Sequence, residues 1–223
     1  LTELAYKWWC PPAGQIIDPF AGGSVRGVVA AMLGYEYTGV DLSAPQIAAN
    51  TLQGLELLPT APGRAVWHQG DSTEIRAIAG GEYDFLFTCP PYGNLEVYSD
   101  DPRDISTMPL DGFFEAYCTI IENAVTMLRP DRFAAIVVGD YRLKDGCYAN
   151  FPALTIEAFQ RAGLRLYNEA VLITVAGSLP VRAHQQFNAS RKLGKSHQNV
   201  LTFVKGDARK AAAACKAPDE QVA

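Results

Sequence analysis

The segment "TCPPYG" at residues 88–93 follows directly on the apolar run "YDFLF" and carries groups that suit a flat amine. Consecutive prolines lack N–H donors and fix their own φ angles, so they are expected to end a strand in a stiff, extended corner. Such a corner aims the Cys89 side chain and the backbone carbonyls in fixed directions, and Tyr92 adds an aromatic face. Acceptors beside an aromatic ring make a receptor for a planar amine. The alternative is a proline-rich turn beside a core tyrosine.

A second stretch, "DPFAGGSVRG" at residues 18–27, lies between an apolar run and a helical pattern. Glycines there allow close approach of the backbone to a ligand, and the helix N-terminus offers free N–H groups. The stretch matches neither GxGxxG nor Gly-Lys-Ser/Thr, and Asp18 at the strand end would repel a phosphate. Asp18 beside this turn therefore suits a cationic or neutral ligand, such as the amine of an amino acid, better than a phosphate; a plain tight βα connection is the alternative.

Asp41 and Asp71 end the next two expected strands, so three successive strands each deliver an acid to the same edge. An acid about 20 residues beyond a glycine turn can accept hydrogen bonds from ribose hydroxyls. Ligands of open α/β sheets bind at the carboxyl ends of the strands. Taken singly, each acid is compatible with a solvated strand end; together they fit a nucleoside that carries a positive group, as S-adenosylmethionine does.

The elements that must position these residues alternate along the chain. We expect strands at 14–18, 35–41, 64–71, 83–88, 132–140, 164–175 and 199–206, and helices at 25–33, 44–54, 111–129 and 151–162. Alternation of this kind predicts an α/β fold: a single doubly wound, mostly parallel sheet. The last two strands have only a long loop, 176–197, between them, so we expect them to pair antiparallel at one end.

Composition limits the classes of protein that fit. The chain has 223 residues, 48% of them hydrophobic and 19% charged, which suits one soluble α/β domain over 1–206 with a C-terminal tail over 207–223. No apolar stretch approaches the roughly 20 residues of a membrane span. The five cysteines have no paired spacing, so we expect reduced thiols, a cytoplasmic location and no metal site.

The net charge of −5 argues against a generic nucleic-acid binder, yet the stretch from Ala170 to Gly206 holds no acidic residue. A solvated loop that lacks acids is one interpretation, and a positive surface facing a polyanion is the other. The candidate nucleic-acid contacts in this stretch are Arg182, Arg191, Lys192, Lys195 and His197.

"DPFAGGS" followed about 70 residues later by "TCPPY" resembles the two main motifs of the amino-group DNA methyltransferases, DPFxGxG and (D/N/S)PPY. The late segment "SRKLGKSHQNVLTFVKG" is similar to phage and prophage DNA-modification methylases. The pair of motifs in this order is specific, whereas either alone is weak. The resemblance covers most of the chain and implies a Rossmann-like class I methyltransferase fold and S-adenosylmethionine as cofactor.

The resemblance also implies roles by position. The implied catalytic residues are Cys89, Pro90, Pro91 and Tyr92. The Cys89 side chain and the Pro90 carbonyl would accept hydrogen bonds from the amino group of the base, and Tyr92 would stack on the flipped base. The resemblance implies that Asp41 binds the ribose of the cofactor and that Asp71 binds its adenine amine. The full set of cofactor-binding candidates is Asp18, Pro19, Phe20, Ala21, Gly22, Gly23, Ser24, Asp41, Leu42, Asp71 and Ser72.

The sequence departs from the family at Cys89, where Asp, Asn or Ser is usual. A thiol is a weak acceptor. Serine, the nearest analogue, is typical of N4-cytosine enzymes, so cytosine N4 is favoured over adenine N6. A cysteine nucleophile for cytosine C5 methylation is a rival, although in that family the cysteine follows the proline. Methylation of RNA or a small amine, and an inactive nucleic-acid-binding module on the same fold, are further alternatives.

The implied partner is double-stranded DNA with the target base flipped, in the cytoplasm of a bacterial or phage-infected cell, and no membrane. The chain begins at Leu1 instead of Met, and little sequence is left for a target-recognition domain. That function is therefore minimal here, lies in an upstream portion, or belongs to a separate specificity partner.

Overall fold

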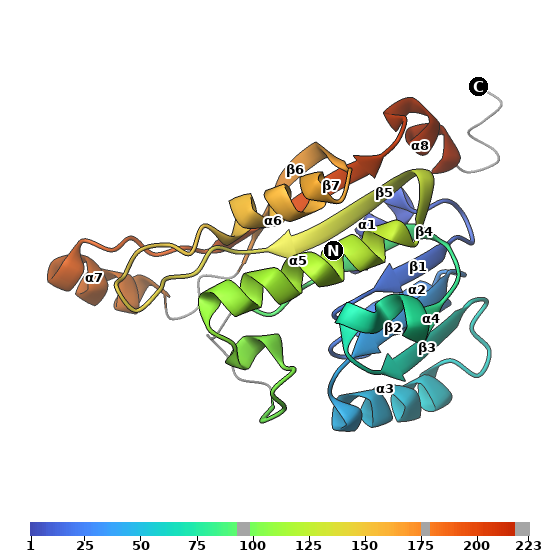
Figure 1. Ribbon diagram of the computed structural model, residues 1–223, viewed down its shortest axis with the longest axis horizontal. Coiled ribbons are helices and arrows are strands. Elements are labelled where there is room, and N and C mark those ends of the chain that lie inside the picture. Colours follow the sequence, from blue (N-terminus) through green and yellow to red (C-terminus); the bar gives the residue numbers. More distant parts are fainter. Residues whose placement is uncertain (93–98, 175–178, 217–223) are drawn as a thin grey trace.

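The computed structural model describes residues 1–92, 99–174 and 179–216. Seven strands form one sheet in the order β3-β2-β1-β4-β5-β7-β6 (Figure 1). The strands are β1 (Gln15–Asp18), β2 (Glu36–Asp41), β3 (Arg64–Gln69), β4 (Tyr83–Thr88), β5 (Leu128–Val138), β6 (Arg165–Ile173) and β7 (His197–Lys205). Strands β1 to β5 pair in parallel, and β7 runs antiparallel to both of its neighbours, β5 and β6. The predicted fold class and the antiparallel terminal pair are confirmed.

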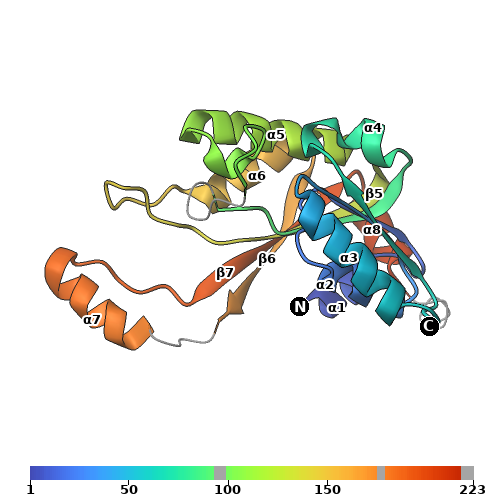
Figure 2. The same cartoon turned by 90° about the horizontal axis from the view of Figure 1, so that it is seen from below.

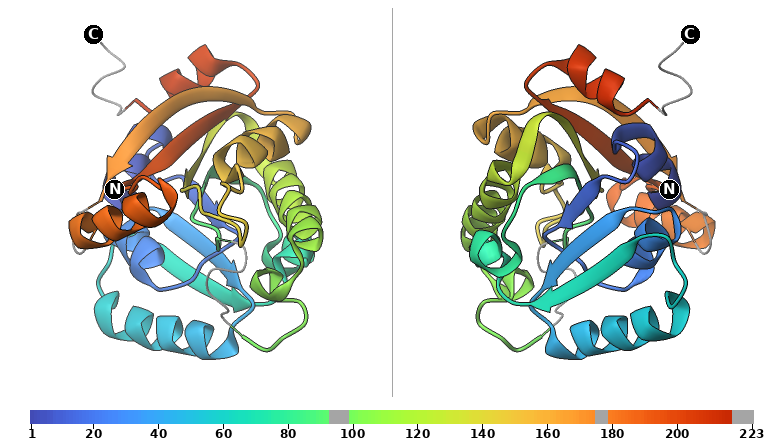
Figure 3. Two further views of the ribbon diagram at one scale, coloured as in Figure 1. Left: turned by 90° about the vertical axis from the view of Figure 1, so that its left-hand side faces the viewer. Right: turned by 90° about the vertical axis from the view of Figure 1, so that its right-hand side faces the viewer.

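Helices cover both faces of the sheet (Figure 3). They are α1 (Thr2–Trp9), α2 (Val25–Met32), α3 (Ala44–Leu57), α4 (Ile75–Ala79), α5 (Leu110–Thr126), α6 (Phe151–Arg161), α7 (Leu179–Ser190) and α8 (Ala208–Ala214), with 3₁₀ turns η1 (Ser72–Glu74) and η3 (Ile105–Thr107). Within the described residues no helix is long and apolar enough to cross a membrane.

Two apolar cores lie on opposite faces because successive strand residues point to opposite sides. In β4, Phe85 and Phe87 pack in the core with α1 and α2, whereas Leu86 packs in the core with α5 and α6. Ile16 and Ile17 of β1 divide in the same way. All six residues of β4 are buried, as expected for a central strand with helices on both faces.

The chain reverses direction across the sheet between β1 and β4. β1 leads through β2 to β3 on one side, and the chain then returns to place β4 on the other side of β1. The gap between the carboxyl ends of these two strands is where open α/β sheets bind their ligands. The glycine stretch follows β1 and the proline corner follows β4, so both motifs meet there.

Several helix termini lie at residues whose types favour a cap. Ser43 caps α3 by accepting the N–H of Gln46, with Pro45 in the first turn. Gly34 and Gly163 follow α2 and α6 with φ of +85° and +89°, the left-handed conformation that ends a helix.

Two expectations are corrected. Part of the expected loop 176–197 is the helix α7, in which the Ser190 hydroxyl donates to the Gln186 carbonyl one turn earlier. Helix α5 ends at Thr126 and β5 begins at Leu128, earlier than expected, because Tyr83 of β4 pairs with Leu128 before the register shifts. After residue 206, α8 packs on the sheet with Ala211 fully buried. Residues 217–223 lie outside the described residues.

Candidate functional site

A cavity of about 460 Å³ lies at the carboxyl edge between β1 and β4. It brings together most of the predicted residues: Pro19, Phe20, Gly22, Gly23, Asp41, Leu42, Asp71, Ser72, Cys89, Pro90, Pro91 and Tyr92. Pockets of a few hundred Å³ are the usual size for cofactors and small ligands. The two motifs, separated by about 70 residues in sequence, therefore line one cavity.

Asp18 lies beneath the cavity and does not line it. Its carboxylate is fully buried and accepts four hydrogen bonds, from the Tyr37 hydroxyl (2.8 Å), the Thr88 hydroxyl (2.6 Å), the Arg26 guanidinium (2.6 Å) and the Phe20 N–H (3.1 Å). This differs from the expectation that Asp18 meets a ligand amine directly. The carboxylate therefore links β1, β2, β4 and the start of the glycine loop, the residues 19–24 that follow β1.

Arg26 was not among the predicted site residues, yet it lines the cavity. Besides its contact with Asp18, it donates to the carbonyl oxygens of Phe20 (2.5 Å) and Ala21 (2.9 Å). Although burial alone would lower the pKa of its guanidinium, the neighbouring Asp18 carboxylate raises it. Arg26 therefore stays charged and curls the glycine loop around its own side chain.

The glycine loop is held from its other side by α3. Asn50, which is buried, donates to the Gly22 carbonyl (2.7 Å) and accepts from Gln46 (2.9 Å). The Ser24 hydroxyl donates to Gln53 of the same helix. Gly22 has φ of +49°, and a Cβ at Gly23 would project into open space at the cavity. Ser24 and Ala21 themselves do not line the cavity; they shape the loop.

Asp41 faces the cavity from the end of β2. One oxygen accepts the N–H of Gly22 (2.8 Å) and the other the N–H of Ser43 (2.9 Å), so the carboxylate is oriented by two backbone groups. Each carboxylate oxygen can accept more than one hydrogen bond. Asp41 therefore keeps acceptor capacity for a ligand while it fixes the loop.

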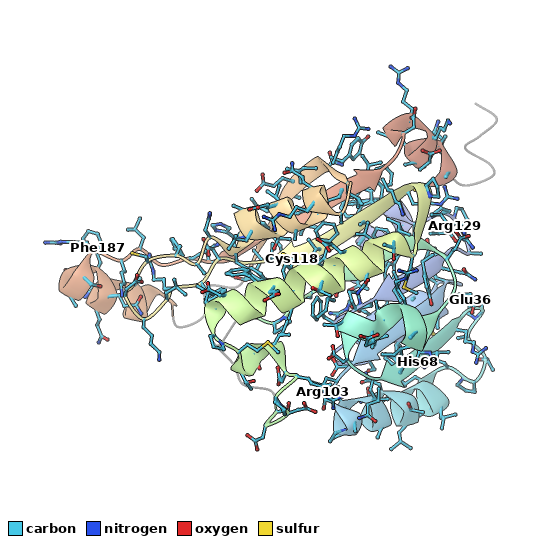
Figure 4. All side chains as sticks on the ribbon, in the orientation of Figure 1. Glu36, His68, Arg103, Cys118, Arg129 and Phe187 are labelled. Atoms are coloured by element: carbon cyan, nitrogen blue, oxygen red, sulfur yellow. The ribbon has the colours of Figure 1, made fainter. Side chains whose placement is uncertain are left out.

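Asp71 and Ser72 form the third wall. Asp71 accepts the N–H of Thr73 at the start of η1 (2.9 Å), and the buried Ser72 hydroxyl donates to the Pro19 carbonyl (2.6 Å). That last bond ties the β3 loop to the glycine stretch. Arg103, labelled in Figure 4, lines the same cavity from the loop after residue 98, together with Ser99 and Asp104.

The proline corner forms the opposite wall. Burial raises the pKa of the Cys89 thiol, and the nearby Arg26 opposes this only in part. A thiol with a raised pKa stays protonated near neutral pH.

The Tyr92 hydroxyl accepts a hydrogen bond from Gln198 of β7, and its ring meets Tyr141 and Phe151 at interplanar angles of 76°. Neither contact is a parallel stack.

An unbroken series of aromatic rings joins the two motifs. Phe20 stacks on Tyr117 of α5 (6.0 Å between ring centres), and Tyr117 meets Phe151 at the start of α6 (5.3 Å). Phe151 in turn contacts Tyr92 (6.1 Å). These packed rings fix the distance between the glycine loop and the corner.

Some residues that line the cavity were not predicted from the sequence. Arg26 lies within the glycine stretch, and Ser43 and Gln46 lie at the start of α3. The remaining ones are Gly70, Ser99, Arg103, Asp104, Ile105 and Ile120. A basic residue inside "GGSVRG" was a usable signal for Arg26. The others carry no motif, because only the fold brings them to the cavity.

The candidate nucleic-acid contacts lie apart from the cavity lining. Arg191, Lys192, Lys195 and His197 follow α7 and lead into β7. The side chain of Arg182 lies outside the described residues. Among the described residues no group of three or more His, Cys, Asp or Glu side chains is placed to hold a metal ion.

No family model matches the sequence. No curated protein matches it either. Solved structures do resemble the fold. TrmN from Thermus thermophilus aligns with a TM-score of 0.55 at 17% identity, over 87% of this chain and 44% of that one.

Two further structures align over more of their own length. Magnesium protoporphyrin IX methyltransferase (ChlM) from Synechocystis PCC 6803, with bound SAH, aligns with a TM-score of 0.58 at 12% identity, over 88% of this chain and 75% of that one. A SAM-dependent methyltransferase from Methanosarcina mazei aligns with a TM-score of 0.59 at 11% identity, over 89% of this chain and 95% of that one. This chain therefore has the Rossmann-like fold found in these methyltransferases.

Proposed function

We propose that this protein is an S-adenosylmethionine-dependent methyltransferase that modifies the exocyclic amino group of a DNA base flipped out of the duplex, with cytosine N4 favoured over adenine N6. The observation that carries the proposal is the single cavity in which the glycine loop, Asp41 and Asp71 face the Cys89–Tyr92 corner. A donor nucleoside and an acceptor amine need such a shared site. The fold shared with methyltransferases supports the donor half.

The chain's residues fit S-adenosylmethionine group by group. Asp41, already oriented by two backbone N–H groups, would accept the ribose hydroxyls. Asp71 would accept a hydrogen bond from the adenine amine. Gly22 and Gly23 leave room for the methionine part of the cofactor. When bound, the cofactor supplies an electrophilic methyl group on a sulfonium.

The corner would act on the incoming base. An exocyclic amine is a poor nucleophile because its lone pair is delocalised into the ring. Accepting both N–H hydrogens favours a pyramidal nitrogen whose lone pair points at the methyl group, and the Cys89 side chain and the Pro90 carbonyl are the acceptors assigned by the resemblance. Tyr92 would stack on the base. The remaining contribution is orientation of nitrogen and methyl carbon in line.

Cytosine C5 methylation, the rival reaction, requires Cys89 as a thiolate. Burial raises the pKa of that thiol, which favours the protonated form. The rival is therefore the less well supported of the two, and it stays as an outcome of the test below.

The test is methyl transfer to DNA that carries no prior methylation, followed by digestion and mass spectrometry of the nucleosides. We expect N4-methylcytosine, or N6-methyladenine in second place. Tyr92→Ala should abolish transfer and keep cofactor affinity. Asp41→Ala should weaken cofactor binding by about 1–3 kcal/mol through loss of charge-assisted hydrogen bonds. This pair of variants also separates the protein's own activity from a contaminating methylase.

A product of 5-methylcytosine would replace the proposal by its rival. Transfer to RNA or to a small amine, with none to DNA, would overturn the choice of substrate. Absence of cofactor binding would leave an inactive module on the same fold and contradict the proposal as a whole.

A further inference from the structure

Two segments far apart in sequence form one positively charged surface beside the proline corner. The first is the turn 141–149 between β5 and α6, and the second is the segment 191–197 that leads from α7 into β7. Both project past the carboxyl ends of the strands on the same side of the molecule (Figure 1 and Figure 2). The left panel of Figure 3 looks onto this edge.

The turn 141–149 is a rigid hairpin. The Ala149 N–H donates to the Tyr141 carbonyl (2.9 Å), and the Leu143 N–H donates to the Cys147 carbonyl (2.8 Å). At its base the Asp140 carboxylate accepts the N–H groups of Tyr141 (3.0 Å) and Phe151 (3.2 Å). The hairpin therefore presents its side chains from a backbone that is fixed at both ends.

Tyr148, 43% exposed, is the point at which the two segments meet. The Arg142 guanidinium lies 4.1 Å from the centre of its ring, and the Lys195 ammonium from the other segment lies 5.8 Å from it. The Arg142 guanidinium also donates to the Gly146 carbonyl (2.9 Å). Cations over an aromatic ring are attracted to its face, which holds them in place.

Lys192 adds another charge to the same place. A Cβ at Gly146 would lie 2.8 Å from the Lys192 ammonium nitrogen, so this side chain rests against the hairpin. Lys144, at the hairpin tip, is exposed. Among the described residues none of these cations forms an ion pair. The one acid in the hairpin, Asp145, accepts the N–H of Cys147 (2.8 Å).

Three like charges held close together, Arg142, Lys192 and Lys195, repel one another. That repulsion is relieved when a polyanion occupies the surface and its own counterions are released. A protein with net charge −5 gains nothing in solubility from this patch. The charge arrangement therefore points to a bound chain of phosphates.

Each segment adjoins a residue that contacts Tyr92. The Tyr141 ring, at the start of the hairpin, lies 6.5 Å from the Tyr92 ring, and Gln198, just after the second segment, donates to the Tyr92 hydroxyl. A nucleic acid held on this surface would thus be positioned by elements that also hold the residue expected to stack on the target base.

We propose that the hairpin 141–149 and the segment 191–197 together form the surface that grips the phosphodiester backbone next to the target base, with Tyr148 as the platform that holds Arg142 and Lys195 in place. The inference rests on the proposed function for its substrate. It extends the sequence-based candidates, which all lay in the acid-free stretch, to a second segment.

The test compares Arg142→Gln/Lys195→Gln with Arg76→Gln/Arg209→Gln, a double variant that removes two exposed cations from helices α4 and α8. Binding of a fluorescein-labelled DNA duplex is measured by anisotropy over a range of salt concentrations. The first variant should bind about tenfold or more weakly, with the slope of log K against log salt reduced by about two. The control should bind as the wild type does, and both should keep the wild-type affinity for S-adenosylmethionine.

Tyr148 supplies a second, milder comparison. Tyr148→Phe keeps the ring and should bind the duplex like the wild type, whereas Tyr148→Ala should lose several-fold in affinity. Wild-type affinity and salt slope in Arg142→Gln/Lys195→Gln would overturn the inference, even if the wild type methylates DNA. If the wild type transfers no methyl group to DNA but binds DNA or an RNA oligonucleotide through these two cations, the inference stands and the proposed function fails.

Discussion

At the scale of single residues, Asp18 and Arg26 are joined by a buried ion pair with several further hydrogen bonds. Asp18 is fully buried, and the Arg26 side chain is 18% exposed. The pair is fully used in shaping the loop, since Arg26 also holds two loop carbonyls. A buried pair of this kind costs desolvation to form, and the loss of one partner leaves an uncompensated charge.

We predict that Arg26→Met lowers the free energy of unfolding by about 3–5 kcal/mol, because the Asp18 carboxylate stays buried without its counter-charge. Urea unfolding followed by circular dichroism measures this. Lys7→Met is the matched control: the Lys7–Glu3 pair is more than half exposed at both side chains, so its loss should cost less than about 1 kcal/mol. Equal urea midpoints for the two variants would contradict the buried role.

Cys89 decides between the two nucleic-acid reactions. We predict that Cys89→Ser keeps or improves amino methylation, because a hydroxyl is a better acceptor than a thiol. C5 methylation and any covalent adduct with 5-fluorocytosine DNA require the thiolate and should vanish in this variant. Product analysis of both proteins by nucleoside mass spectrometry makes the comparison. Loss of all transfer in Cys89→Ser, with wild-type cofactor affinity, would argue for a nucleophilic cysteine.

At the scale of elements, α3 supports the glycine loop through polar side chains on one of its faces. Asn50 is buried against Gly22, and Gln46 orients its amide. The helix thereby stabilises a loop whose Gly22 has a positive φ. Cofactor affinity should depend on this helix although Asn50 itself does not line the cavity.

We predict that Asn50→Ala weakens S-adenosylmethionine binding several-fold and destabilises the fold by about 1–3 kcal/mol, since the Gly22 carbonyl loses the donor that Asn50 supplies. Isothermal titration calorimetry and urea unfolding measure the two effects. Thr51→Ala, one residue along and exposed, is the control and should change neither quantity beyond about 0.5 kcal/mol. Unchanged cofactor affinity in Asn50→Ala would mean that the loop keeps its shape without α3.

At the scale of the whole molecule, the core on the α1 and α2 face contains ionisable groups that are held neutral. Burial raises the pKa of Tyr6, Tyr37 and Cys10 well above their ordinary values, and it raises the pKa of Cys215 to about 11. The folded state therefore retains protons that the unfolded chain releases from about pH 9 upward, at the ordinary pKa of cysteine and then tyrosine. Stability from these groups is complete below that pH and is lost as the pH rises.

We predict that the free energy of unfolding falls between pH 9 and 11, by about 1.4 kcal/mol per pH unit for each group that the unfolded chain ionises. Urea titrations at several pH values measure the slope. Cys10→Ala removes one of the two thiols that ionise first on unfolding and should show a shallower decline from pH 9 to 10. A stability that stays constant up to pH 11 would contradict burial of these groups.

The sequence by itself determined the fold class and the edge of the sheet at which the two motifs meet. Alternating strand and helix patterns gave the parallel sheet, and an acid or glycine turn at the end of a strand lies at the carboxyl edge whatever the details of packing. For that reason Asp41, Asp71 and the proline corner were placed correctly relative to one another from sequence. Local signals, such as Ser43 before α3 and Gly163 after α6, depend on neighbouring residues alone and were readable for the same reason.

The tertiary structure alone decided how each charged residue is used. Asp18 looks like a ligand-binding acid in sequence, but the hydroxyls of Tyr37 and Thr88 reach it only because β2 and β4 flank β1. Arg142 and Lys195 are 53 positions apart, and only the turn between β5 and α6 brings them to one tyrosine ring. Contacts between distant segments depend on packing of the whole chain, which no local pattern encodes. The elements were therefore predictable, while the partners of their side chains were not.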